Sequence, residues 1–168
     1  MKKALIIIDM QNDFVGGALA NSSAQAIVDE IVTYASNFDG DLIATRDTHQ
    51  KNYLETSEGK HLPVVHCVHG TPGWEIVTPI STLLNERGAH IVDKPTFGYL
   101  DWDFLSAYDE VTLVGTCTDI CVVSNALVLK AKFPDLIVNV KADLCAGTTT
   151  ENHEAALKVM ACCQVNVL

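Results

Sequence analysis

The sequence predicts a three-layer α/β/α fold with a mostly parallel, Rossmann-like central sheet of about six strands. Short apolar runs alternate along the chain with helix-like segments, a pattern typical of a parallel sheet covered by helices on both faces. Most of these runs are apolar throughout, as expected of strands that are buried on both faces. The 168 residues are 48% hydrophobic, so we expect one domain over residues 1–168 with a substantial core.

The strand-like runs, in chain order, span residues 4–8, 41–44, 90–92, 111–114, 136–140 and 165–168. The helix-like segments span residues 23–38, 74–86, 119–132 and 151–162. The long irregular segment 45–73 is the exception to the alternation. Because a loop of this length inside a compact domain is usually functional, it is a candidate site region.

Composition excludes several classes of function. The formal net charge of −10 argues against nucleic acid and against an anionic membrane surface as partners. No apolar stretch is long enough to span a bilayer. No G-x-G-x-x-G follows a strand and no P-loop pattern is present, so the nucleotide-binding folds lack support.

The amino-terminal run 4–8 resembles a signal peptide only faintly. Asp9 interrupts it and no small-residue cleavage site follows, so we expect a cytoplasmic protein. Six cysteines in such a chain indicate free thiols rather than a disulfide framework. The adjacent pair Cys162 and Cys163 is expected in the core or at a subunit contact, so a homo-oligomer stays open.

Cys121 is a candidate nucleophile. It follows the strand 111–114 closely and lies in the first turn of the predicted helix 119–132, with Thr118 or Asp119 as the N-cap. The helix dipole and the free N–H groups at that position favour the thiolate, the form that attacks carbon. The alternative is a buried structural cysteine, the commoner fate of this residue type.

Ligands of open α/β sheets bind beyond the carboxyl ends of the strands, where Asp9 and Lys94 also lie. Asp9 could accept the thiol proton if burial raises its pKa, and Lys94 could hold thiolate and carboxylate in place by charge. A thiolate so placed can attack an amide carbonyl and form an acyl-enzyme. The alternatives are a turn residue for Asp9 and a solvated surface charge for Lys94.

A second cluster lies in the segment 45–73. Asp47 and His49 are two residues apart in an extended segment, so their side chains point the same way, and Glu58 and His66 could complete the set. Mixed nitrogen and oxygen ligation suits zinc, iron or manganese without selecting strongly among them. The alternative is a polar loop with incidental histidines.

Five segments carry a resemblance to a known family: DMQNDF at 9–14, RDTH at 46–49, HCVHGTPGW at 66–74, DK at 93–94 and GTCTDIC at 115–121. They extend over most of the chain in the family's order. On these segments the chain resembles the isochorismatase-like cysteine hydrolases and, within that family, the nicotinamidases. True isochorismatases lack both the nucleophilic cysteine and the metal-binding set.

The resemblance implies roles for named residues. Asp9, Lys94 and Cys121 would form the catalytic triad. A cis peptide bond would precede Cys117, and the N–H groups of Cys117 and Cys121 would form the oxyanion hole.

The resemblance also implies one divalent metal ion. Asp47, His49 and His66 match the family's ligands, and Glu58 matches a fourth ligand that some members add. Zinc is the expected ion, with iron or manganese as alternatives, and in such enzymes the metal is thought to bind the pyridine nitrogen of the substrate.

The expected partner is a small-molecule amide. Phe14, Phe97 and Tyr99 could form aromatic walls for a flat ring, although Phe14 and Phe97 could equally be ordinary core residues. The activity implied is hydrolysis of nicotinamide to nicotinate and ammonia through a thioester. The alternatives are a related hydrolase of another small amide or carbamoyl substrate and a non-catalytic ligand-binding domain, against which the intact triad residues argue.

Overall fold

The computed structural model describes residues 1–168 and contains one six-stranded sheet in the order β3-β2-β1-β4-β5-β6. All neighbouring strands are parallel. The strands are β1 Lys3–Ile8, β2 Asp41–Asp47, β3 His90–Lys94, β4 Glu110–Thr116, β5 Ile137–Ala146 and β6 Asn166–Val167. The predicted α/β fold with a parallel sheet of about six strands is therefore confirmed.

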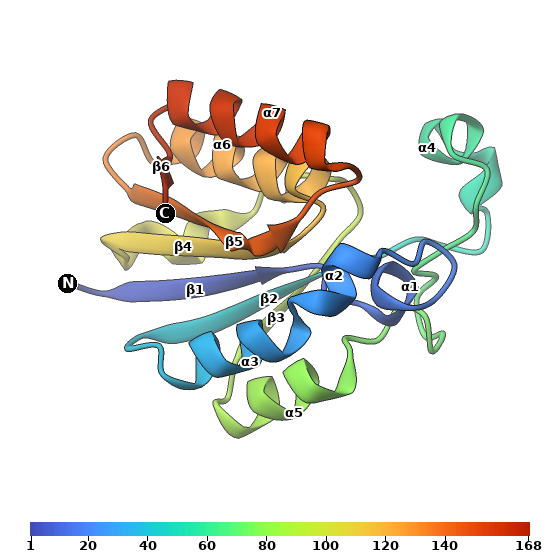
Figure 1. Cartoon of the computed structure of the whole chain (residues 1–168), viewed down its shortest axis with the longest axis horizontal. Coiled ribbons are helices and arrows are strands. Elements are labelled where there is room, and N and C mark those ends of the chain that lie inside the picture. Colours follow the sequence, from blue (N-terminus) through green and yellow to red (C-terminus); the bar gives the residue numbers. More distant parts are fainter.

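Helices cover both faces of this sheet. They are α2 Ser22–Ala26, α3 Val28–Ser36, α5 Thr78–Glu86, α6 Val123–Lys132 and α7 Thr150–Cys162. Figure 1 shows α3 and α5 on one face and α6 and α7 on the other. Leu5 and Ile7 of the central strand β1 pack toward α3 and α5, whereas Ile6 and Ile8 pack toward α6 and α7. Burial on both faces explains why this strand is an unbroken apolar run.

The helix boundaries differ from the sequence prediction in three places. The predicted helix 23–38 is divided at Ile27 into α2 and α3. The predicted helix 74–86 begins only at Thr78, because Ile76 forms a bridge to Gln11 instead. The predicted helix 119–132 begins as a π-helical turn, Thr118–Val122, and continues as α6.

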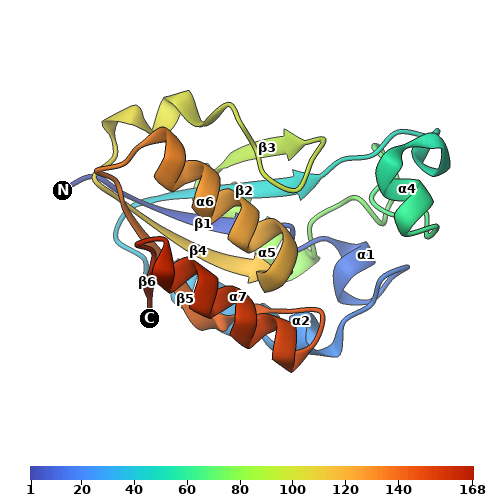
Figure 2. The same ribbon diagram turned by 90° about the horizontal axis from the view of Figure 1, so that it is seen from above.

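Several short elements were not predicted. They are α1 Asn12–Val15, α4 Ser57–His61 and the 3-10 turns Tyr53–Glu55 and Trp102–Ala107. Elements of three to six residues are too short for a hydrophobic period to show in the sequence. The segment that carries α4 projects beyond the carboxyl ends of the strands, while both termini lie at the opposite end of the sheet (Figures 1 and 2).

The cysteines are all free, as the sequence predicts. The interpretation of Cys162 and Cys163 as core residues is wrong, because both are exposed at the end of α7, whose buried residues are Ala156 and Met160. Among the helices of the structure, none has the length and apolar character that a bilayer crossing requires.

Candidate active site and metal centre

The carboxyl ends of three strands bring Asp9, Lys94 and Cys121 together. Asp9 directly follows β1, Lys94 ends β3, and Cys121 lies in the π-helical turn after β4. The Lys94 ammonium nitrogen Nζ lies 2.7 Å from Asp9 Oδ2 and 3.4 Å from Cys121 Sγ. Asp9 and Lys94 are 0% exposed and Cys121 is 5% exposed. The three residues thus form one buried cluster that a small substrate, rather than a protein chain, would have to reach.

Thr45 fixes the Asp9 carboxylate. Its hydroxyl donates to Asp9 Oδ1 at 2.6 Å and accepts from the Asp9 N–H at 3.2 Å. Asp9 has a φ of 49°, in the left-handed region where a residue with a side chain pays about 1–2 kcal/mol. This role of Thr45 was not predicted from the sequence. The signal in the sequence was a hydroxyl residue that directly follows the buried apolar run Leu42–Ala44 of β2.

The electrostatics of this cluster follow from burial and close charges. Burial raises the pKa of Asp9, and the nearby Lys94 charge offsets that only in part. Burial by itself lowers the pKa of Lys94, but the charges of Asp9, Cys121 and Asp47 raise it overall, so the ammonium stays protonated. An aspartate of raised pKa beside a thiol is suited to accept its proton.

Burial dominates the electrostatics of the Cys121 thiol. Burial, followed by the negative charge of Asp9, raises the pKa of Cys121 well above its usual value. This differs from the expectation that the helix terminus would favour the thiolate. The reason is that the thiol itself is buried beside Asp9, so desolvation outweighs the helix dipole. The thiolate has to form as the thiol attacks, with transfer of its proton.

The peptide bond between Thr116 and Cys117 is cis, as the resemblance implies. Cys117 caps the following turn through its backbone, because its carbonyl accepts the N–H groups of Ile120 at 3.0 Å and Val122 at 3.1 Å. The Cys117 side chain is half-buried.

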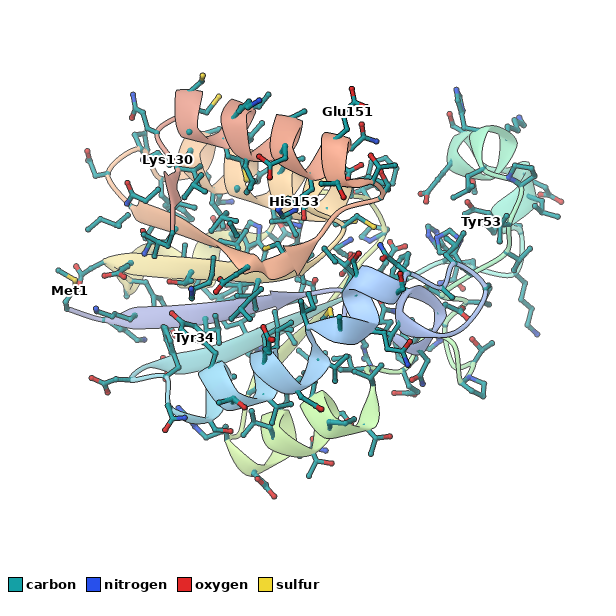
Figure 3. The ribbon with its side chains drawn as sticks, in the orientation of Figure 1. Met1, Tyr34, Tyr53, Lys130, Glu151 and His153 are labelled. Atoms are coloured by element: carbon teal, nitrogen blue, oxygen red, sulfur yellow. The ribbon has the colours of Figure 1, made fainter.

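Thr118 and Asp119 do not cap this helix, so that prediction is wrong. The Thr118 hydroxyl lies 2.8 Å from His153 Nδ1, and Asp119 accepts hydrogen bonds from the N–H and hydroxyl of Thr148. These side chains bind the turn to the start of α7 instead of its own backbone. Figure 3 labels His153 on α7.

Asp47, His49, Glu58 and His66 form a candidate metal-binding group, with one ligand atom of each within 4.8 Å of the others. His49 Nε2 lies 2.8 Å from Asp47 Oδ2 and 3.5 Å from Glu58 Oε1. His66 Nε2 lies 3.5 and 3.8 Å from the same two oxygens. Ligands bound at 2.0–2.1 Å in a tetrahedron are about 3.3 Å apart. The spacing therefore fits a single ion.

Protonation states in this group also suit a cation. His66 Nδ1 donates to the Val64 carbonyl at 2.8 Å, which orients the ring so that Nε2 faces the carboxylates of Asp47 and Glu58. Although burial alone raises the pKa of Asp47, hydrogen bonds from His49 and His66 and the charge of Lys94 hold it well below its usual value. Asp47 Oδ1 is buried without a hydrogen-bond partner. An ionised, unsatisfied oxygen of this kind fits a metal ligand.

Gln11 holds the backbone of Asp47, a candidate metal ligand. The Gln11 side-chain oxygen accepts from the Asp47 N–H at 2.7 Å, and its amide nitrogen donates to the carbonyls of Asp47 at 2.9 Å and Trp74 at 2.8 Å. Asp13 supports the other side of the group, because Oδ2 accepts from the Cys67 N–H, next to His66, at 2.8 Å. Gln11 and Asp13 lie in the segment DMQNDF, in which only Asp9 and Phe14 were predicted to have roles.

Tyr53 packs against both histidines of the group. Its ring meets the rings of His49 and His66 edge to face, with centroids 4.7 and 5.0 Å apart. The Tyr53 hydroxyl donates to the Leu62 carbonyl at 2.9 Å, which closes the projecting segment on itself. Figure 3 labels Tyr53 at this position. A lone aromatic residue within the segment 45–73 was the signal in the sequence.

The three aromatic residues expected to form walls lie in different settings. The Phe14 ring meets the His66 ring edge to face at 5.6 Å, which places it beside the metal-binding group. Phe97 is 44% exposed on the loop after β3, so it is not a core residue. Tyr99 packs edge to face on Trp102 at 5.1 Å. Their role as substrate walls stays a prediction.

Comparison with known proteins agrees with these features. Residues 3–168 match the isochorismatase domain. A nicotinamidase/pyrazinamidase of Mycobacterium tuberculosis is 32% identical over 99% of this chain and 98% of that protein. The crystal structure of a Pyrococcus horikoshii pyrazinamidase in complex with zinc superposes with a TM-score of 0.84 and 28% identity over 100% of this chain and 99% of that one. The crystal structure of a pyrazinamidase/nicotinamidase of Streptococcus mutans superposes with a TM-score of 0.86 and 27% identity, over 99% of this chain and 100% of that one. The chain therefore belongs to the isochorismatase family.

Proposed function

We propose that this protein is a metal-dependent cysteine amidohydrolase that converts nicotinamide and water to nicotinate and ammonia. The observation that carries the proposal is the position of Lys94 between two groups of side chains. Its Nζ lies 3.4 Å from Cys121 Sγ and 3.7 Å from Asp47 Oδ1. A small flat amide with a ring nitrogen can therefore meet the thiol and the metal-binding group at once. The nicotinamidases and pyrazinamidases among its relatives support the same substrate class.

The first half of the reaction releases ammonia. Cys121 Sγ attacks the amide carbon while its proton passes to Asp9, whose raised pKa suits that role. The N–H groups of Cys117 and Cys121 stabilise the oxyanion that forms. Asp9 then returns the proton to the amide nitrogen, the carbon–nitrogen bond breaks, and ammonia leaves a thioester on Cys121.

The second half releases the acid. Water attacks the thioester carbon as Asp9 takes a proton from it, and the carbon–sulfur bond breaks to free nicotinate and the Cys121 sulfur, which regains the proton. Throughout, Lys94 keeps a fixed positive charge beside groups whose charges change. Such a preorganised charge stabilises the transition state without reorganisation.

The metal ligands in this proposal are Asp47, His49 and His66, with Glu58 as the fourth. The ion is zinc, with iron or manganese as alternatives, since the mixed donor set accepts all three. When bound, the ion supplies a Lewis-acid contact for the ring nitrogen of the substrate. Phe14, Phe97 and Tyr99 are proposed to line the ring.

Six free cysteines, one of them the proposed nucleophile, suit a reducing compartment, so we place the protein in the cytoplasm.

The test measures nicotinate and ammonia released from nicotinamide by the purified protein. We expect equal amounts of both products from the native chain and only background from Cys121→Ala. Cys162→Ala is the matched control, because Cys162 is an exposed thiol at the end of α7 and should keep full activity. Substantial turnover by Cys121→Ala would contradict the thiol mechanism. Release of ammonia from other small amides but not from nicotinamide would favour the related-hydrolase alternative.

A further inference from the structure

Asn125 joins two parts of the site that lie far apart in the sequence. It is 0% exposed and lies in α6, one helical turn after Cys121. Its Oδ1 accepts from the Tyr99 N–H at 2.9 Å, and its Nδ2 donates to the carbonyls of Phe97 at 3.1 Å and Cys121 at 2.8 Å. One buried amide thus fastens the loop after β3 to the turn that carries the nucleophile.

The same loop is fastened to the triad from its other end. Lys94 Nζ donates to the Thr96 carbonyl at 3.2 Å and to Cys121 Sγ at 3.4 Å. The contacts therefore close a ring that runs from Lys94 through the loop to Asn125, on to Cys121 and back to Lys94. A change at Asn125 would loosen the loop and the thiol together.

The loop also lies directly on α6. A Cβ atom at Gly98 would lie 3.2 Å from the Val128 side chain and 3.4 Å from the Ser124 carbonyl. A glycine here lets the backbone approach the helix closely enough for the Asn125 amide to reach both sides of Gly98.

We propose that Asn125 is a positioning residue that sets the loop carrying Phe97 and Tyr99 in register with the Cys121 thiol. A buried asparagine with three hydrogen bonds could serve stability alone, but its partners here are the carbonyl of the nucleophile and the backbone of both predicted wall residues. The effect on turnover rests on the proposed function, whereas the effect on the Cys121 thiol does not.

The test compares Asn125→Ala with Asn139→Ala. Asn139 is also buried, and it donates to Glu110 Oε1 and accepts from Asn166 Nδ2, both at 2.9 Å. It lies near the start of β5, at the end of the sheet away from the site, so it reports the loss of a buried amide without a change at the site. The measurements are kcat and KM for nicotinamide and the rates at which iodoacetamide labels Cys121 and the buried Cys145, separated by mass spectrometry.

For Asn125→Ala we expect kcat to fall about 10- to 100-fold, as misplacement of a reacting group does, with a smaller change in KM. Cys121 should label at least about fivefold faster because local opening becomes easier when hydrogen bonds are lost, while Cys145 labels at the native rate. Asn139→Ala should leave kcat and Cys121 labelling close to native. Asn125→Ser, whose hydroxyl can bond the carbonyl one turn back, should lie between native and Asn125→Ala.

Equal acceleration at Cys121 and Cys145 would show a general loosening and overturn the proposal, as would native kcat and native Cys121 labelling in Asn125→Ala. If Asn125→Ala does not fold, Asn125→Ser decides by the same two rates. If the native protein does not hydrolyse nicotinamide, the proposed function fails and Cys121 labelling alone decides the role of Asn125.

Discussion

Replacing Lys94 by methionine tests the buried charge cluster on which the chemistry depends. Methionine keeps the length and apolar stem of the side chain but removes its charge. In the native protein that charge lies 2.7 Å from Asp9 Oδ2 and 3.7 Å from Asp47 Oδ1, and all three side chains are buried. Lys94→Met therefore leaves two carboxylates without their shared cation.

The expected loss of stability is large but measurable. Removing one partner of a buried ion pair costs about 3–5 kcal/mol, against a total of about 5–15 kcal/mol for a domain. With a urea m-value of about 2 kcal/mol/M, the unfolding midpoint should fall by about 2 M. Lys132→Met is the matched control: Lys132 pairs with Asp103 at 2.7 Å on the surface, and such pairs contribute about 0–1 kcal/mol.

The loss should also depend on pH. Burial raises the folded-state pKa of Asp9 above the unfolded value of about 3.9. Between these two values the folded state binds more protons than the unfolded state, so stability falls as pH rises through that window. Without Lys94 the Asp9 pKa rises further and the window widens. The raised pKa of Lys94 adds no pH dependence here, because its contribution is lost only above about pH 10.4.

The assay is urea unfolding of the native chain and both variants at about pH 5 and about pH 7.5, with excess chelator so that metal binding does not contribute. Lys94→Met should be less destabilised at the lower pH and inactive at both. A loss no greater than that of Lys132→Met, or a loss that does not shrink at the lower pH, would refute the electrostatic reasoning.

Three other outcomes are expected. Metal content and activity should fall together on chelation and return with zinc, iron or manganese; activity that ignores chelators would remove the metal from the proposal. Burial alone lowers the pKa of His66, but its hydrogen bond to Asp47 raises that pKa overall. Because ligands must be unprotonated, metal affinity measured by equilibrium dialysis should begin to fall at a pH above the ordinary histidine value of about 6.5. A metal affinity that stays constant down to about pH 5 would contradict this. Gln11→Leu should lower metal affinity about 10- to 100-fold by releasing the Asp47 backbone, whereas unchanged affinity would show that Gln11 serves only the fold.

The sequence predicted the architecture well because the dominant signal is strong. The strand 4–8 is an unbroken apolar run and 111–114 is apolar apart from Thr112, and burial on both faces of a parallel sheet favours that pattern. Because ligands of open α/β sheets bind beyond the carboxyl ends of the strands, Asp9, Lys94 and Cys121 were expected at one edge of the sheet. The structure brings them into contact. The chain's membership in the isochorismatase family was predicted from motifs spread over most of the chain.

What the sequence did not reveal depends on contacts between distant segments. Thr118 and Asp119 read as caps by their residue type, yet their partners lie in and before α7. The raised pKa of the Cys121 thiol follows from its burial beside Asp9, which helix position alone does not indicate. The sequence around Asn125 does not indicate its proposed role, because a polar residue in a helix is usually solvated. Only its contacts with the loop after β3 suggest that role.

The rate of hydrolysis of nicotinamide relative to benzamide tests the central proposal most directly. The two amides have the same shape, but benzamide has no ring nitrogen for the group formed by Asp47, His49, Glu58 and His66. Sites built around a polar contact reject analogues that lack it far better than apolar pockets reject isosteres. We expect kcat/KM of the native protein to favour nicotinamide strongly, and His49→Ala and His66→Ala each to lose most of that preference. Equal kcat/KM for the two amides in the native protein would contradict joint action of the thiol and the metal-binding group on one substrate.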